Sequence, residues 1–151
     1  MKISGEYALP VAPDRAYSLL QDPVLLAKCM PGCERLDLIG EDEYAMRMKM
    51  VLASMSGLFD GKVRIADPEP PVSFRLVVEG SGKIGFMKGD GKLTMAAADA
   101  ATRVQFDGEV QVGGLIANVG QRLLDTTSRM LIKRFFRNMT EELSGMSAAA
   151  D

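Results

Sequence analysis

The residue types that carry most protein chemistry are scarce in this chain. Its 151 residues include no histidine, the commonest general base and metal ligand, and only two cysteines. Cys29 and Cys33 flank Met-Pro-Gly in a C-x₃-C spacing, whereas thioredoxin-type redox chemistry uses C-x-x-C at the start of a helix. Cys29 falls near an expected helix end, where the helix dipole opposes a thiolate. We therefore expect two structural thiols and no bound metal.

A glycine motif raises the question of nucleotide binding. Gly80, Gly82 and Gly85 match G-x-G-x-x-G after a predicted strand. A dinucleotide site would need a helix to begin there, because the helix N-terminus holds the pyrophosphate. The next residues, 86–91, include two more glycines and do not begin a stable helix. We interpret the motif as a twisted hairpin or a close approach of a ligand to the backbone, with a cavity mouth near 82–89 as a hypothesis.

The middle of the chain, from Cys33 to Gly113, alternates apolar and polar residues with a period of two. This pattern predicts an antiparallel sheet with one solvated face. The charged residues expected on that outward face are Arg47, Lys49, Asp60, Lys62, Arg64, Arg75, Glu79, Arg103, Asp107 and Glu109. The inward face then offers Met, Phe, Val, Leu and Gly, with Tyr7, Tyr44, Asn118 and Gln121 as polar groups. That composition is typical of a site for an apolar ligand and unlike an acid–base site.

Helical segments flank the predicted sheet. After a first strand over 2–9, Pro13 and an Asp22-Pro23 cap predict two short helices. A longer helix is predicted from Leu115 to Leu143, released from the last strand by Gly113-Gly114. Its apolar positions recur at steps of three and four: Ile116, Val119, Leu123, Thr127, Met130 or Leu131, Phe135, Met139 and Leu143.

This order of elements predicts an α+β fold in which a curved antiparallel sheet wraps around a long C-terminal helix. The two short helices are inserted after the first strand. We expect one domain over residues 1–144 and a flexible tail over 145–151.

Several stretches resemble a known family. They are Met1-Lys-Ile-Ser-Gly-Glu-Tyr7, Cys29-Met-Pro-Gly-Cys-Glu34, Phe59-Asp-Gly-Lys-Val-Arg64, Pro70-Pro71, Gly80-Ser-Gly82, and Val112-Gly-Gly-Leu-Ile-Ala-Asn-Val-Gly-Gln-Arg-Leu-Leu124. Together they resemble the carbon monoxide dehydrogenase CoxG-like family of the START-like (SRPBCC) superfamily, which implies a helix-grip fold. The resemblance implies a non-catalytic accessory protein with a hydrophobic cavity, beside molybdenum hydroxylases of the carbon monoxide dehydrogenase type. It also implies quinone or lipid binding and membrane recruitment or electron-acceptor delivery.

The expected cavity is lined by inward residues of the sheet and by one face of the long helix. They are Met46, Met48, Met50, Phe74, Leu76, Met95, Phe106, Val110, Ile116, Val119, Gly120, Leu123 and Thr127. The 11 methionines suit an adaptable apolar surface. Gly120 would cost a helix about 1 kcal/mol relative to Ala. We therefore expect a strand or a ligand packed against its backbone.

A basic stripe on the long helix is the one candidate for contact with a macromolecule. Arg122, Arg129, Lys133 and Arg137 recur along one side, with Phe136 beside them. The stripe is either a solvated helix face or a contact for anionic lipids or an acidic partner protein. Two alternatives stay open: an assembly factor acting through this helix, and a polyketide cyclase/dehydrase-like enzyme on the same fold.

Charge and hydropathy limit the remaining classes of partner and location. A net charge of −2 gives no general attraction to nucleic acid. The N-terminus MKISGEYAL lacks the apolar region of a signal peptide, and no apolar run is long enough to span a bilayer. We expect a cytoplasmic protein, with peripheral contact at the inner membrane face left open. We expect no covalently bound cofactor, and a quinone, isoprenoid or lipid as ligand.

Overall fold

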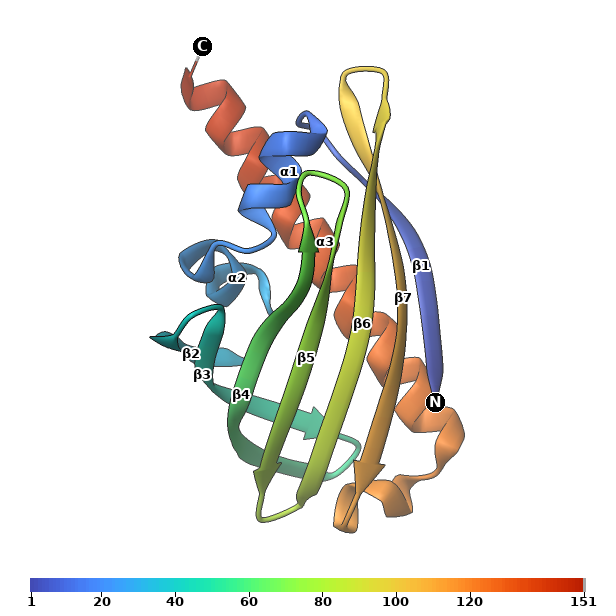
Figure 1. The fold of residues 1–151 in the computed structure, drawn as a ribbon. Helices are drawn as coiled ribbons and strands as arrows, with labels where there is room; N and C mark the ends of the chain where they lie inside the picture. Colours follow the sequence, from blue (N-terminus) through green and yellow to red (C-terminus); the bar gives the residue numbers. More distant parts are fainter. Residues whose placement is uncertain (151) are drawn as a thin grey trace.

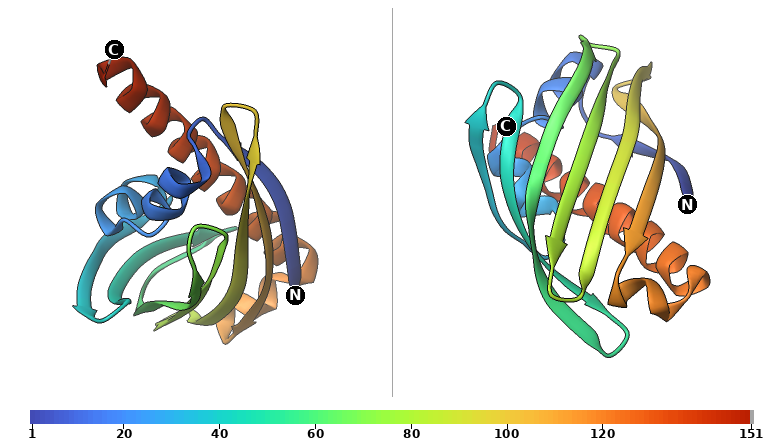
Figure 2. Two further views of the ribbon diagram at one scale, coloured as in Figure 1. Left: turned by 45° about the horizontal axis from the view of Figure 1, so that its top comes forward. Right: turned by 60° about the horizontal axis from the view of Figure 1, so that its bottom comes forward.

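In the computed structural model, a seven-stranded antiparallel sheet curls around one long helix (Figures 1 and 2). The strand order is β1-β7-β6-β5-β4-β3-β2. The strands are β1 (Lys2–Leu9), β2 (Cys33–Gly40), β3 (Glu43–Leu52), β4 (Met55–Glu69), β5 (Ser73–Gly82), β6 (Gly85–Ala98) and β7 (Ala101–Gly113). The structure describes the backbone of residues 1–150 and the side chains of residues 1–145. The predicted α+β helix-grip architecture is confirmed.

Two short helices, α1 (Pro13–Leu19) and α2 (Pro23–Cys29), connect β1 to β2. Each has a proline at its first turn, where no N–H is needed. The Asp22 side chain caps α2 by accepting hydrogen bonds from the N–H groups of Val24 and Leu25, at 2.9 and 3.3 Å. Both helices lie on the inner side of the sheet, next to the C-terminal half of the long helix (Figure 1).

The alternation predicted from the sequence is confirmed in the register of the strands. Across β3 to β7, one inner row pairs Tyr44 with Val63, Val63 with Val78, Val78 with Gly89, and Gly89 with Val110. The charged residues expected on the outer face carry partly or fully exposed side chains there. One-residue slips are excluded because they would move those charges into the core.

The buried apolar residues form two clusters at opposite ends of the inner side. The larger, which we call the α1-end cluster, joins α1, α2 and the C-terminal half of the long helix to the sheet through residues such as Phe74 and Met139. The smaller, the β3–β4-end cluster, consists of Leu52, Phe59, Ile116 and Leu124 with partly buried neighbours. On the inner face, Leu76, Val78 and Phe106 are only partly buried and pack against the α1-end cluster.

The long helix begins later than the sequence predicted. Residues Leu115–Val119 form a short 3₁₀ helix, η1, and the α-helix α3 spans Gln121–Ala150. Gly120 separates them with φ +99° and ψ 152°, a conformation open almost only to glycine. The expectation that a strand packs against Gly120 is wrong, because no heavy atom of the protein lies within 4 Å of a Cβ built there. A ligand at Gly120 stays a prediction.

The long helix also ends later than the sequence predicted. Helix α3 does not end at Leu143 but continues to Ala150. The side chains of 146–150 and all of Asp151 lie outside the described residues. The flexibility expected for 145–151 stays a prediction.

The conformation of Gly120 can be tested against a matched glycine. Gly120→Ala should lower the free energy of unfolding by about 1–3 kcal/mol, because the backbone there disfavours any Cβ. Gly145→Ala should be neutral or stabilising by up to about 1 kcal/mol, because Gly145 is helical and equally free of neighbours. Urea unfolding of both variants measures the difference. Equal changes in the free energy of unfolding would contradict the backbone conformation assigned to Gly120.

Candidate functional site

Glycines occupy several neighbouring positions on the inner face of the sheet. Gly61, Gly80, Gly89, Gly91 and Gly108 all lie at inward register positions of β4 to β7. A Cβ would collide with neighbouring atoms at Gly61, Gly91 and Gly108, whereas at Gly89 it would meet nothing closer than 3.9 Å.

Apolar side chains around the glycines are only partly buried. Leu76 pairs with Gly91, Val78 pairs with Gly89, and Val110 pairs with Gly89 from the other side. All three, and Phe106, retain intermediate exposure although they point inward. We call Leu76, Val78, Phe106, Val110 and the glycines at 89, 91 and 108 the inner apolar surface. A contiguous group of apolar side chains that water still reaches is typical of a ligand-binding groove or an interaction site.

The ring of Phe106 lies close to the backbone of β6 and β7. A Cβ built on Gly91 would lie 2.5 Å from this ring, and one built on Gly108 would lie 2.8 Å from it. The ring therefore lies over the backbone of two glycines instead of reaching toward α3. At Gly89, by contrast, a Cβ would meet nothing closer than 3.9 Å. At these positions the inner face therefore consists of the strand backbone and of the Phe106 ring that lies against it.

The residues predicted to line a cavity fall into three groups. Five are packed within the core: Met46, Met48, Phe74, Met95 and Ile116. Seven retain intermediate exposure: Met50, Leu76, Phe106, Val110, Val119, Leu123 and Thr127. Gly120 is exposed at the turn before α3. Their role toward a ligand stays a prediction.

Not all of the polar residues that were expected to face inward do so. Asn118 and Gln121 are exposed, and Tyr44 is buried. Sequence reasoning missed Tyr17 on α1, which is 7% exposed and whose hydroxyl has no hydrogen-bond partner among the described residues. Its neighbours Ala16 and Leu20 are also buried. The apolar face of this short helix is therefore the sequence feature that indicates that Tyr17 is buried.

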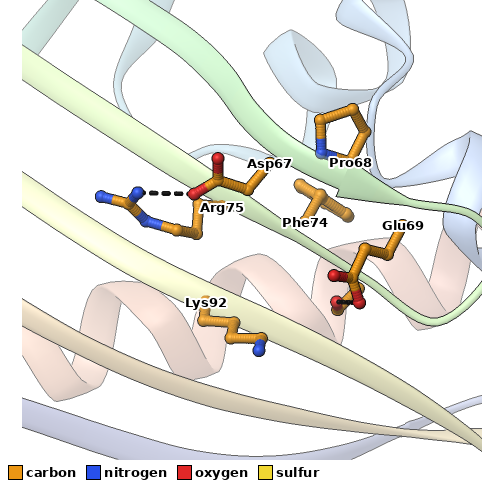
Figure 3. Close-up of a pocket in the computed structure, with 7 residues that line it drawn as sticks. Asp67, Pro68, Glu69, Phe74, Arg75 and Lys92 are labelled. Carbon is orange, nitrogen blue, oxygen red and sulfur yellow. Dashed lines mark hydrogen bonds and ion pairs between the residues drawn. The ribbon is translucent and has the colours of Figure 1, made fainter.

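Two open hollows lie on the charged outer face of the sheet. The first, about 400 Å³, is lined by Asp67, Pro68, Glu69, Ser73, Phe74, Arg75 and Lys92 (Figure 3). Arg75 is paired there with both Asp67, at 2.7 Å, and Asp90, so its charge is already neutralised. The second, about 430 Å³, is lined by Lys2, Ile3, Ser4, Asp90, Asp107, Gly108 and Glu109. Charged side chains dominate both hollows, which suits neither of them to an apolar ligand.

The two cysteines are free thiols in different surroundings. Cys29 ends α2 and is fully buried; burial, and then the nearby Glu142 carboxylate, raise the pKa of its thiol to about 11. Burial also raises the pKa of the half-buried Cys33 thiol. Both thiols are therefore poor nucleophiles at neutral pH, as expected for structural cysteines.

The basic stripe lies on α3 as predicted, except for its aromatic member. Arg122, Arg129, Lys133 and Arg137 are exposed, and Arg129 pairs with Asp125 at 2.9 Å. Phe136 does not belong to this surface, because it is 4% exposed and stacks on Tyr7 with ring centroids 4.2 Å apart. The expectation that Phe136 contacts a membrane or partner is therefore wrong.

Within the part of the chain that the structure describes, no cluster of three or more His, Cys, Asp or Glu side chains is placed to hold a metal ion. In the same part of the chain, no helix combines the length and apolarity needed to cross a bilayer.

A curved antiparallel sheet around a C-terminal helix, with an apolar inner face, defines the START-like helix-grip class. A START superfamily protein from Mycobacterium smegmatis shares the fold with a TM-score of 0.74 and 10% identity, over 96% of this chain and 98% of that one. The Zhui aromatase/cyclase from Streptomyces sp. R1128 gives a TM-score of 0.67 and 13% identity, over 95% and 93%. These likenesses establish the fold alone.

The family follows from closer comparisons. The family model for CoxG of carbon monoxide dehydrogenase matches residues 5–144, and the chain belongs to this family. A conserved protein from Geobacillus kaustophilus is 32% identical over 96% of both chains, with a TM-score of 0.90. A search of curated protein sequences finds no match. Family and fold together support a ligand-binding helix-grip protein.

The thiol environments predict a difference in alkylation. Iodoacetamide at pH 8 should modify Cys33 slowly and leave Cys29 unmodified until the protein unfolds, as mass spectrometry of native and urea-treated protein would show. The raised pKa of Cys29 also predicts how the free energy of unfolding depends on pH. The unfolded state loses this proton at lower pH, so the free energy of unfolding should fall as pH rises from 9 through about 11. Rapid native labelling of Cys29 would contradict its burial.

Proposed function

We propose that this protein binds an apolar ligand against the inner apolar surface and does not catalyse a reaction. The single observation that carries the proposal is the band of glycines and partly exposed apolar side chains on the inner face of the sheet. Covering apolar area of this kind releases roughly 25 cal/mol per Å². A quinone, an isoprenoid or another lipid is the ligand class that such a surface suits.

The polyketide cyclase/dehydrase-like alternative fits the inner face less well. Catalysis of that kind needs titratable groups converging on the reacting atoms. The inward register positions of β3 to β7 carry Met, Phe, Val, Leu, Ile, Gly, Tyr44 and Thr102, and the charged side chains of these strands point outward. The Thr102 hydroxyl already donates to the Val11 carbonyl at 2.7 Å. This distribution supports binding over catalysis.

Family membership suggests the setting in which the ligand is used. We propose that the protein acts beside a carbon monoxide dehydrogenase-type molybdenum hydroxylase, either recruiting it to a membrane or delivering an electron acceptor. The exposed cations of α3 are the surface that would contact the enzyme or an anionic membrane. The assembly-factor alternative uses this helix alone and needs no ligand.

Filling the inner apolar surface should block binding. Gly89→Leu places a side chain where a Cβ meets nothing closer than 3.9 Å, so the fold should persist. The added side chain occupies ligand volume, and the affinity for decyl-ubiquinone or lauric acid should fall at least tenfold, measured by isothermal titration calorimetry.

Lys88→Leu is the matched control, because Lys88 is the preceding residue on the exposed outer face. It should leave both affinities unchanged. Unaltered binding by a folded Gly89→Leu protein would exclude the inner apolar surface as the site.

The basic stripe makes a separate prediction. The double change Lys133→Glu and Arg137→Glu should weaken binding to vesicles containing anionic lipid, or to the partner enzyme, and the loss should shrink at high salt. Arg64→Glu with Lys88→Glu reverses the same charge on the outer face and serves as control. Sedimentation with vesicles measures both. Equal binding by the two variants would remove the stripe from the proposal.

A further inference from the structure

A buried hydroxyl on α1 is the polar group whose surroundings the fold does not account for. Tyr17 is 7% exposed, and its hydroxyl is the one buried side-chain N or O atom among residues 1–145 without a hydrogen-bond partner. The hydroxyls of two other buried residues have partners: Thr102 donates to the Val11 carbonyl, and Ser73 contacts Glu69 at 3.5 Å. Leaving a buried hydroxyl unpaired is unfavourable, so native proteins rarely do so without a functional reason.

The Tyr17 ring packs on Phe74, one inward position along β5 from the inner apolar surface. It meets Phe74 of β5 edge to face, with centroids 5.5 Å apart and planes at 88°. The next inward residue of β5 is Leu76, and the inner row of Phe74 continues through Leu93 to Phe106. Leu76 and Phe106 both belong to the inner apolar surface. Helix α1 lies over this end of the sheet (Figure 1), and its Tyr17 phenol packs on Phe74, the residue of β5 next to that surface.

The geometry points to Tyr17 as the residue that hydrogen-bonds a carbonyl oxygen of the bound ligand. This inference rests on the proposed function, because it needs a ligand on the inner apolar surface. A phenol O–H is a good donor, and a ligand of mainly apolar surface with one carbonyl would be oriented by it. Ring carbonyls of a quinone and ester carbonyls of a lipid share this chemistry.

The ligand is then held in one direction. Its carbonyl end lies toward α1 and the α1-end cluster, and its apolar remainder lies over Gly89, Gly91 and Gly108. The inner face has many apolar contacts but few hydroxyls, so a single donor at one end decides the orientation.

Tyr17→Phe removes only the oxygen and tests the inference directly. The variant should bind decyl-ubiquinone about tenfold more weakly, or 1.4 kcal/mol. Binding of decylbenzene, which keeps the ring and chain but has no carbonyl, should change less than twofold. Methyl laurate separates the two carbonyl sources: a loss with the quinone alone indicates a quinone site, and a loss with the ester alone indicates an ester lipid. Unchanged affinity for both carbonyl compounds would overturn the inference.

Two further readouts distinguish a ligand contact from a structural one. The free variant should unfold at the same or a higher urea concentration than the parent, because an unpaired hydroxyl is lost; marked destabilisation would mean that a buried water pairs with Tyr17, and would overturn the inference. The infrared carbonyl stretch of bound decyl-ubiquinone should shift to lower frequency in the parent and not in the variant. Failure of the parent to bind either decyl-ubiquinone or decylbenzene would refute the proposed function itself, and the role of Tyr17 with it.

Discussion

The structure depends on how α3 is held at the margins of the sheet and kept away from its centre. Helix α3 packs mainly against β1, α2 and η1. On one side Phe136 stacks on Tyr7 of β1, and on the other the Asn138 amide donates to the Cys29 carbonyl at 2.9 Å. An exposed ion pair, Lys28 with Glu142 at 3.3 Å, adds little to this attachment. Because the helix is fixed at both sides, the sheet has to curve around it, and glycines take several of the inner-face positions that it curves over.

Much of the fold follows from periodicity, for a physical reason. A strand whose outer face carries residues such as Lys62 and Arg64 has only one register that keeps them in water. The short helices were equally predictable, because Pro13 and the Asp22-Pro23 pair act locally. The hairpin at Gly82–Gly85 was distinguishable from a nucleotide loop, since no helix could begin after it.

The sequence-based predictions fail where tertiary contacts or an unusual backbone conformation determine the local structure. Ile116 and Val119 fit the helical spacing of the residues after them, so periodicity alone cannot reveal the 3₁₀ helix and the break at Gly120. Phe136 lies beside the exposed cations in sequence, yet β1 covers it. An α-helix packed on two sides buries a wider arc than one stripe predicts. Tyr17 was missed because its significance lies in an unpaired atom, which only coordinates can reveal.

The position of β1 has a consequence for how the chain acquires its structure. This first strand pairs with the last, from Lys2 opposite Glu109 to Leu9 opposite Thr102. During synthesis, β1 therefore has no strand partner until β7 has been made, and only then can α3 follow and dock on β1. Contacts so distant in sequence slow folding and lengthen the time for which an apolar strand stays unpaired. The same closure that completes the sheet thus leaves the N-terminal strand exposed to association with other chains until most of the protein has been synthesised.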